Sequence, residues 1–156
     1  MKKGIKFTLW VILIILVAIQ FVPVDKENPI GDRNSDFLIV TQAPEDVQLI
    51  MRNACYDCHS NETIWPWYSD FAPVSFVIAN HVEEGREHLN FSNWGNYESS
   101  DHPSILKHMK KEINKNAMPL AGYVKLHAEA NISEDGKVLI MDWLDSVLST
   151  YEIIDK

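Results

Sequence analysis

Cysteine is scarce in this sequence, and this limits the chemistry that thiols can perform. Only Cys55 and Cys58 occur, separated by Tyr56 and Asp57. No second cysteine pair is present to complete a four-cysteine zinc site, and no network of disulfides can form. Any thiol chemistry is therefore confined to one short stretch of the chain.

Basic residues are also few. Lys and Arg number 14 against 22 Asp and Glu, which gives a net charge of −8 at neutral pH. Binding to nucleic acid depends on basic side chains that neutralise phosphates, so we expect no nucleic-acid partner. An acidic surface can serve solubility, and it can also steer a positively charged protein partner. Both roles remain open.

Long apolar runs are missing except for one, Ile5–Val24, which carries no charge after Lys6. This run is close to the roughly 20 apolar residues that cross a bilayer. Lys2, Lys3 and Lys6 lie before or at its start, and the positive-inside rule places that end in the cytoplasm. We predict a single-pass anchor of the bacterial inner membrane over residues 1–24, with the following domain in the periplasm.

A cleaved signal peptide is the alternative for this run. However, Ala18-Ile19-Gln20 is a poor cleavage pattern, and apolar residues continue through Phe21 and Val22. We favour an uncleaved anchor that contacts the membrane through residues 5–24. In either case the functional part of the chain is exported.

The rest of the chain is expected to be a linker and one all-α domain. Residues 25–42 contain Pro29, Gly31 and scattered charges, with an apolar patch at Phe37–Val40 where the domain begins. From 43 to 156, helix-starting residues are followed by apolar residues at helical spacing. We predict a helical domain over 43–156 in which the last helix packs across the first.

The stretch Cys55-Tyr56-Asp57-Cys58-His59 carries the strongest functional signal. It has the form C-x-x-C-H, the attachment signature of a c-type haem. Two thiols one helical turn apart can add to the two vinyl groups of one haem, and the histidine that follows can coordinate the iron. We predict one covalent haem c, with His59 as the proximal iron ligand.

Three other interpretations of these residues compete. The cysteines could form a redox dithiol, but that function is typical of a βαβ context that the sequence does not indicate. They could form half of a zinc site completed by His59 and another histidine, although the usual second half is missing. They could form a structural disulfide. None of the three explains why a histidine follows the second cysteine.

An aromatic loop and a proline-stiffened turn add candidates for the haem pocket. Trp65, Trp67 and Tyr68 follow the motif and are predicted to wall the haem, although such residues also fill small cores. Met118 precedes Pro119 well downstream of the motif and is the predicted sixth iron ligand. The alternative is that Met118 is apolar filling.

Two further residues have competing interpretations. His81 lies on the apolar stripe of the predicted helix that ends near residue 88, and it is the rival for the sixth position. Arg86, on the same helix, is a candidate partner for a haem propionate. A surface ion pair explains Arg86 equally simply.

Several motifs together resemble the haem-binding domain family of small bacterial cytochrome-c-like proteins. The resemblance covers about residues 44–148 and rests on Cys55-Tyr-Asp-Cys-His-Ser-Asn-Glu-Thr, Trp65-Pro-Trp-Tyr-Ser, Ala72-Pro-Val, Asn90-Phe-Ser-x-Trp, Met118-Pro and Tyr123. It implies a cytochrome-c-like helical fold with one covalent haem. It also implies that Cys55 and Cys58 carry the thioethers, with His59 as proximal and Met118 as distal ligand.

Two functions follow from this interpretation. A six-coordinate haem predicts an electron carrier that exchanges electrons with redox protein partners and is not itself an enzyme. A displaceable sixth ligand predicts a haem sensor or a peroxidase-type enzyme. A weaker third possibility is a haem that serves mainly as structural core. The sequence separates the first two only through Met118.

Overall fold

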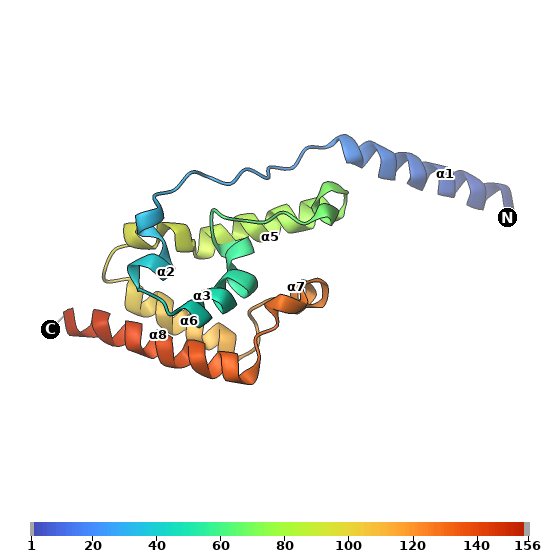
Figure 1. Ribbon diagram of the computed structural model, residues 1–156. Coiled ribbons are helices and arrows are strands. Elements are labelled where there is room, and N and C mark those ends of the chain that lie inside the picture. The colour runs from blue at the N-terminus through green and yellow to red at the C-terminus, as the bar shows by residue number, and fades with distance from the viewer. Residues whose placement is uncertain (1, 155–156) are drawn as a thin grey trace.

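The computed structural model describes residues 2–154, and all regular structure within them is helical (Figure 1). The predicted all-α class is therefore confirmed. The N-terminal helix α1 (Lys2–Ala18) extends into the single turn η1 (Ile19–Phe21) and projects away from the other helices. The remaining elements are η2 (Arg33–Ser35), α2 (Phe37–Val40), α3 (Glu45–Met51), η3 (Arg52–Tyr56), α4 (Asp57–His59), η4 (Trp67–Asp70), α5 (Val74–His88), η5 (Phe91–Asn96), α6 (His102–Asn114), α7 (Ala121–Leu126), η6 (Ala128–Ala130) and α8 (Glu134–Ile154).

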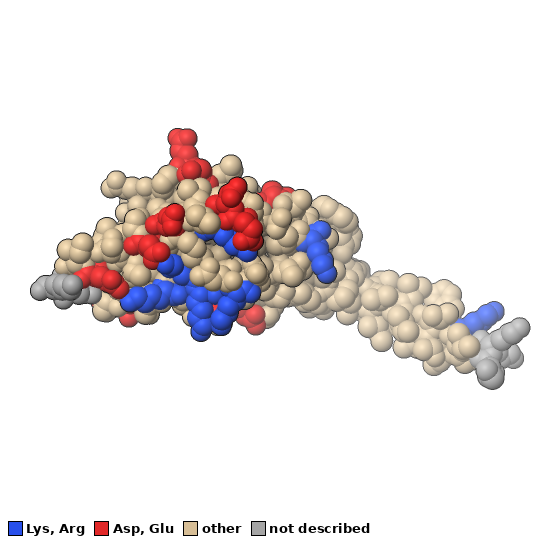
Figure 2. Space-filling view, turned by 90° about the horizontal axis from the view of Figure 1, so that it is seen from below, with Lys and Arg blue, Asp and Glu red and all other residues tan. Residues whose placement is uncertain are grey.

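Helix α1 is long and apolar enough to cross a membrane. The window Gly4–Phe21 spans 18 residues with a mean hydropathy of 2.2, and none of it is buried inside the protein. Figure 2 shows α1 without charged side chains on the visible face, except near its N-terminal end. An apolar helix of this length near the N-terminus is typical both of a membrane span and of a signal sequence.

The packed domain begins before residue 43. Phe37 and Leu38 of α2 are fully buried, and the Phe37 ring lies 4.5 Å from that of Trp94 and 5.2 Å from that of Trp143, centroid to centroid. The ring of Phe91 stacks on that of Tyr56, with the ring centroids 5.1 Å apart. The apolar patch expected at the start of the domain is therefore one of the main contributors to its aromatic core.

Two long helices close the core from the other side. Helix α8 packs along α6 and also against α3, which confirms that the last helix crosses the first one of the domain. Ile140 and Leu144 of α8 and Leu106 of α6 are fully buried between them. On the outside, Lys107 of α6 pairs with Glu152 of α8 at 2.9 Å. Basic and acidic side chains accordingly lie beside one another on the face shown in Figure 2.

Candidate haem site

Three successive helical segments, α3, η3 and α4, position the residues of the C-x-x-C-H motif. Glu45 and Asp46 occupy the first turn of α3, where carboxylates complement the helix dipole, and Val47 and Met51 bury its inner face. The chain then widens into the π-helical segment η3, which holds Cys55, and tightens again into α4. π-helical turns are rare and frequently lie at functional sites.

The ring of His59 is held in place by two backbone carbonyls. Its Nδ1 lies 2.9 Å from the carbonyl oxygen of Gly85 and 3.0 Å from that of Leu89. Because both partners are acceptors, Nδ1 must carry the proton, and Nε2 keeps its lone pair. Burial lowers the pKa of His59, which favours the neutral ring. Histidines that bind metals characteristically donate the other ring N–H to such a partner.

Gly85 allows helix α5 to approach the motif closely. A Cβ atom at this position would lie 2.5 Å from the carbonyl oxygen of Cys58 and 3.2 Å from its Cβ. Only glycine can therefore occupy this crossing while its own carbonyl accepts the proton of His59. Sequence analysis missed Gly85, because nothing local marks it as the point where α5 meets α4.

The two cysteines are free thiols. Burial, with a smaller contribution from Cys58, raises the pKa of Cys55 to about 12. Burial, followed by the nearby carboxylate of Asp57, raises the pKa of Cys58 to about 11. A reactive redox dithiol needs a lowered pKa, so this environment disfavours that alternative. Within the described residues, no three His, Cys, Asp or Glu side chains gather as a zinc site.

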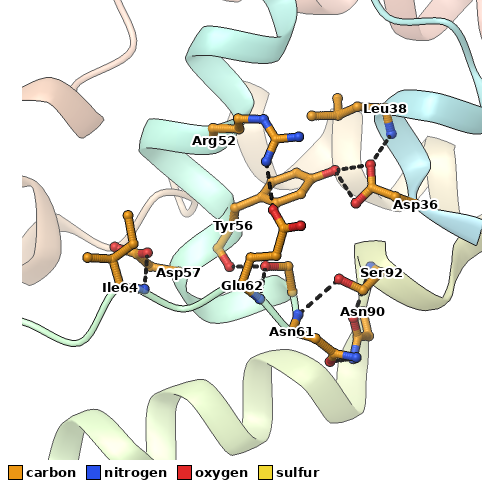
Figure 3. Close-up of polar contacts among 11 residues, drawn as sticks. Asp36, Leu38, Arg52, Tyr56, Asp57, Asn61, Glu62, Ile64, Asn90 and Ser92 are labelled. Carbon is orange, nitrogen blue, oxygen red and sulfur yellow. Dashed lines mark hydrogen bonds and ion pairs between the residues drawn. The ribbon is translucent and has the colours of Figure 1, made fainter. Parts of the chain in front are cut away.

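The two residues between the cysteines connect the motif to opposite sides of the domain (Figure 3). The Tyr56 hydroxyl donates to both carboxylate oxygens of Asp36, at 3.0 and 3.1 Å, and so ties the segment before α2 to the motif. Asp57 points the other way. Its carboxylate accepts from the Ile64 backbone N–H at 2.9 Å and from the Tyr123 hydroxyl at 2.6 Å.

Asp36 is a buried carboxylate whose charge opposes folding. Burial raises the pKa of Asp36, while hydrogen bonds from Tyr56 and the Leu38 backbone lower it less. A raised pKa means that the folded state binds this proton more tightly than the unfolded state. The contribution of Asp36 to the free energy of unfolding therefore grows as the pH falls through the pKa of Asp36 in the folded state. It is complete below 3.8, the ordinary pKa of an aspartate.

Replacing Asp36 with Asn should remove this pH dependence while keeping an oxygen that accepts from Tyr56 and Leu38. We expect the stability of Asp36→Asn relative to wild type to fall as the pH is lowered from 7 towards 4. Urea unfolding at a series of pH values would measure this. Asp32→Asn is the matched control, because Asp32 caps η2 in the same way but is exposed. Parallel pH profiles for D36N and wild type would contradict the prediction.

The four residues after His59 bind the motif to the rest of the domain. Ser60 accepts from the Glu62 backbone at 2.9 Å, and the Asn61 backbone donates to Ser92 at 3.0 Å. The Asn61 side chain accepts from Asn90 at 2.8 Å (Figure 3). The Ser-Asn-Glu-Thr and Asn-Phe-Ser-x-Trp motifs, thirty residues apart, are therefore two halves of one contact.

Arg86 forms no ion pair among the described residues, and its pairing with a haem propionate stays a prediction. Its Nε donates to the Ser60 carbonyl at 2.8 Å, and its terminal nitrogens donate to Thr63 Oγ1 at 2.9 Å and to Asn28 Oδ1 at 2.7 Å. These partners are uncharged oxygens of the protein itself. Arg86 is a connector between α5, the segment after the motif and the chain that leads from α1.

The three aromatic residues of the loop after the motif differ in exposure. The indole Nε1 of Trp65 is buried and has no hydrogen-bond partner among the described residues. Trp67 is 76% exposed. The Tyr68 hydroxyl is hydrogen-bonded to His127 Nε2 at 2.5 Å, and His127 Nδ1 lies 3.2 Å from Glu129. That all three contact a haem stays a prediction.

Met118 lies in the turn between α6 and α7 and is 36% exposed. Helix α7 begins three residues later and reaches the motif through the bond from Tyr123 to Asp57. The chain around Met118 is thus brought towards the segment that carries Cys58 and His59. Its role as iron ligand stays a prediction. His81, the rival, is exposed on α5.

Comparison with families of known proteins matches residues 14–146 to the haem-binding domain family. The chain belongs to the haem-binding domain family. Membership of this family and the binding of haem are thereby confirmed. Comparison with curated proteins and with solved structures found no significant match.

The residues of this haem-binding domain fit the cofactor that the family name implies. His59 has an unshared ring nitrogen, because no described hydrogen bond uses its Nε2. Trp65 has a buried donor without an acceptor. Apolar side chains are exposed on the two helices that contact the motif, among them Val77 on α5 and Leu120 and Leu126 around α7. A large apolar ring with acidic edges would satisfy each of these groups.

Proposed function

We propose that this haem-binding domain is a membrane-anchored c-type cytochrome that transfers electrons in the periplasm. Helix α1 holds it in the inner membrane, and redox proteins are its partners. Cys55 and Cys58 bind one haem covalently. His59 is the proximal ligand and Met118 the distal one. The haem, when bound, supplies an iron that changes valence.

The orientation of His59 carries this proposal. Two backbone carbonyls hold its Nδ1–H, so Nε2 is available on the residue that follows Cys58 and lies one helical turn after Cys55, and both thiols are unpaired. Trp65 has a donor available for a haem propionate. Tyr68, held by His127, and Tyr123, held by Asp57, fix the aromatic loop and α7 on either side of the motif. Such hydrogen bonds around a haem are among the features that set its reduction potential.

A visible spectrum of the full chain, made in a host that attaches haem, tests the proposal. We expect a low-spin c-type spectrum in both oxidation states that carbon monoxide leaves unchanged, and haem that survives acid–acetone extraction. Cys55→Ser combined with Cys58→Ser is the matched control and should release the haem on extraction. A spectrum that shifts with carbon monoxide would instead support a sensor or peroxidase. No bound haem would contradict the proposal.

A further inference from the structure

The end of α1 is bonded directly to the haem domain. Gln20, in the turn η1 that ends the apolar helix, donates from Nε2 to the Ala72 carbonyl at 2.9 Å. The Ala72 backbone N–H donates back to Gln20 Oε1 at 3.0 Å. Residue 72 therefore lies at the level where the apolar helix ends, just before α5 begins.

The segment after α1 is held along the domain at further points. Lys26 pairs with Asp70 at 2.6 Å, and the Asn28 side chain donates to the Thr63 carbonyl at 2.9 Å. Arg86 also donates to the Glu27 carbonyl at 3.1 Å. These contacts join α1 to η4, to the segment after the motif and to α5. The domain is thus oriented relative to α1 and does not hang on a free tether.

The surface at this end of the domain is aromatic and apolar. Trp67 of η4 and Phe71 lie edge to face with ring centroids 6.1 Å apart, and both are exposed. Phe21 at the end of α1 is also exposed. The one acidic residue of η4 is Asp70, which Lys26 neutralises. Exposed aromatic rings beside the end of a membrane-spanning helix are typical of the bilayer interface.

We propose that the junction of η4 and α5 is a second membrane-binding surface. Trp67 and Phe71 enter the headgroup region of the bilayer that α1 spans, and the haem domain rests on the membrane in one orientation. The occupant is lipid because the surface continues directly from α1 through the two Gln20–Ala72 hydrogen bonds. The proposal rests on the membrane anchoring put forward above. In this proposal Trp67 contacts lipid, whereas the sequence predicts that it lines the haem pocket.

Photocrosslinking of the full chain in phosphatidylethanolamine–phosphatidylglycerol vesicles tests this surface. Benzoylphenylalanine would replace Phe71, and in the control it would replace Ile39, which is exposed on α2 at the far end of α5 (Figure 1). After irradiation, mass spectrometry should find lipid adducts at position 71 at least tenfold more often than at position 39. Equal yields would overturn the proposal. Because adducts form without haem, failure of the haem proposal would leave this result intact.

A double variant separates a membrane-facing role of the two rings from a haem-facing one. Trp67→Ser combined with Phe71→Ser should leave the visible spectrum and haem content unchanged. It should also lower the yield of lipid adducts from benzoylphenylalanine placed at Val74, the first residue of α5. Loss of haem, or a shifted spectrum, would place the rings in the haem pocket and overturn the proposal.

Discussion

Replacing Gly85 with alanine is expected to destabilise the haem domain and to reduce its haem content. The added Cβ would meet the backbone carbonyl oxygen of Cys58 at 2.5 Å, and neither atom can move without a shift of the backbone that holds it. Helices α4 and α5 must therefore separate. Forcing extra atoms into a packed contact typically costs about 1–3 kcal/mol. Urea unfolding followed by circular dichroism, with the full chain in detergent, would measure the loss.

The haem content of Gly85→Ala should fall further than the loss of stability alone would cause. The Gly85 carbonyl accepts the Nδ1 proton of His59, so moving α5 also disturbs the ring that is the proposed iron ligand. We expect the fraction of chains with haem, measured as pyridine haemochrome, to fall several-fold. Gly122→Ala is the matched control, because a Cβ there meets nothing within 4 Å. It should be neutral or stabilising by up to about 1 kcal/mol, since alanine favours a helix over glycine. Similar behaviour of both variants would contradict the proposed crossing.

Met118→Ala should change the spectrum without removing the haem. If the Met118 thioether is the sixth ligand, its loss leaves iron with one axial position open to water or carbon monoxide. We expect most of the low-spin signal to become high-spin, and the reduced protein to bind carbon monoxide. Loss of the soft ligand should also lower the reduction potential, because a thioether favours reduced iron.

Met141→Ala controls for the loss of a methionine. Met141 lies on α8 and is partly buried against the core, so its truncation tests destabilisation without touching the turn after α6. This variant should unfold more easily and keep the wild-type spectrum. If Met118→Ala also keeps the wild-type spectrum, Met118 is not the distal ligand.

Features that depend on local sequence could be predicted well. Helical periodicity predicted the all-α class, and the local spacing of Cys55, Cys58 and His59 predicted haem binding, while the role of each of these three residues stays a prediction. The apolar patch at Phe37–Val40 was also expected at the domain start. How deeply this patch is buried in the core could not be predicted, because burial depends on which distant residues pack against it.

Roles that depend on long-range contacts escaped prediction. Arg86 was assigned to a propionate or an ion pair, since nothing in its own helix reveals that Asn28 and Ser60 lie beside it. Asp57 occupies an unspecified position of the motif, yet it anchors Tyr123 from a helix more than sixty residues away. The backbone carbonyl of Gly85 accepts a hydrogen bond from His59, and residue type gives no indication of which backbone carbonyls do so.

The π-helical segment η3 has a geometric consequence for the motif. Each residue of an α-helix advances by about 100°, and a π turn takes in one residue more than an α turn. Everything after η3 is thereby rotated by about one residue's step relative to a regular helix from Glu45 onwards. This phase shift lets Val47 and Met51 face the core while His59, on the same run of helix, faces the carbonyls of α5. A single-residue deletion within Arg52–Ala54 would remove the extra residue that the π turn takes in, so a regular α-helix would then point the histidine in the same direction.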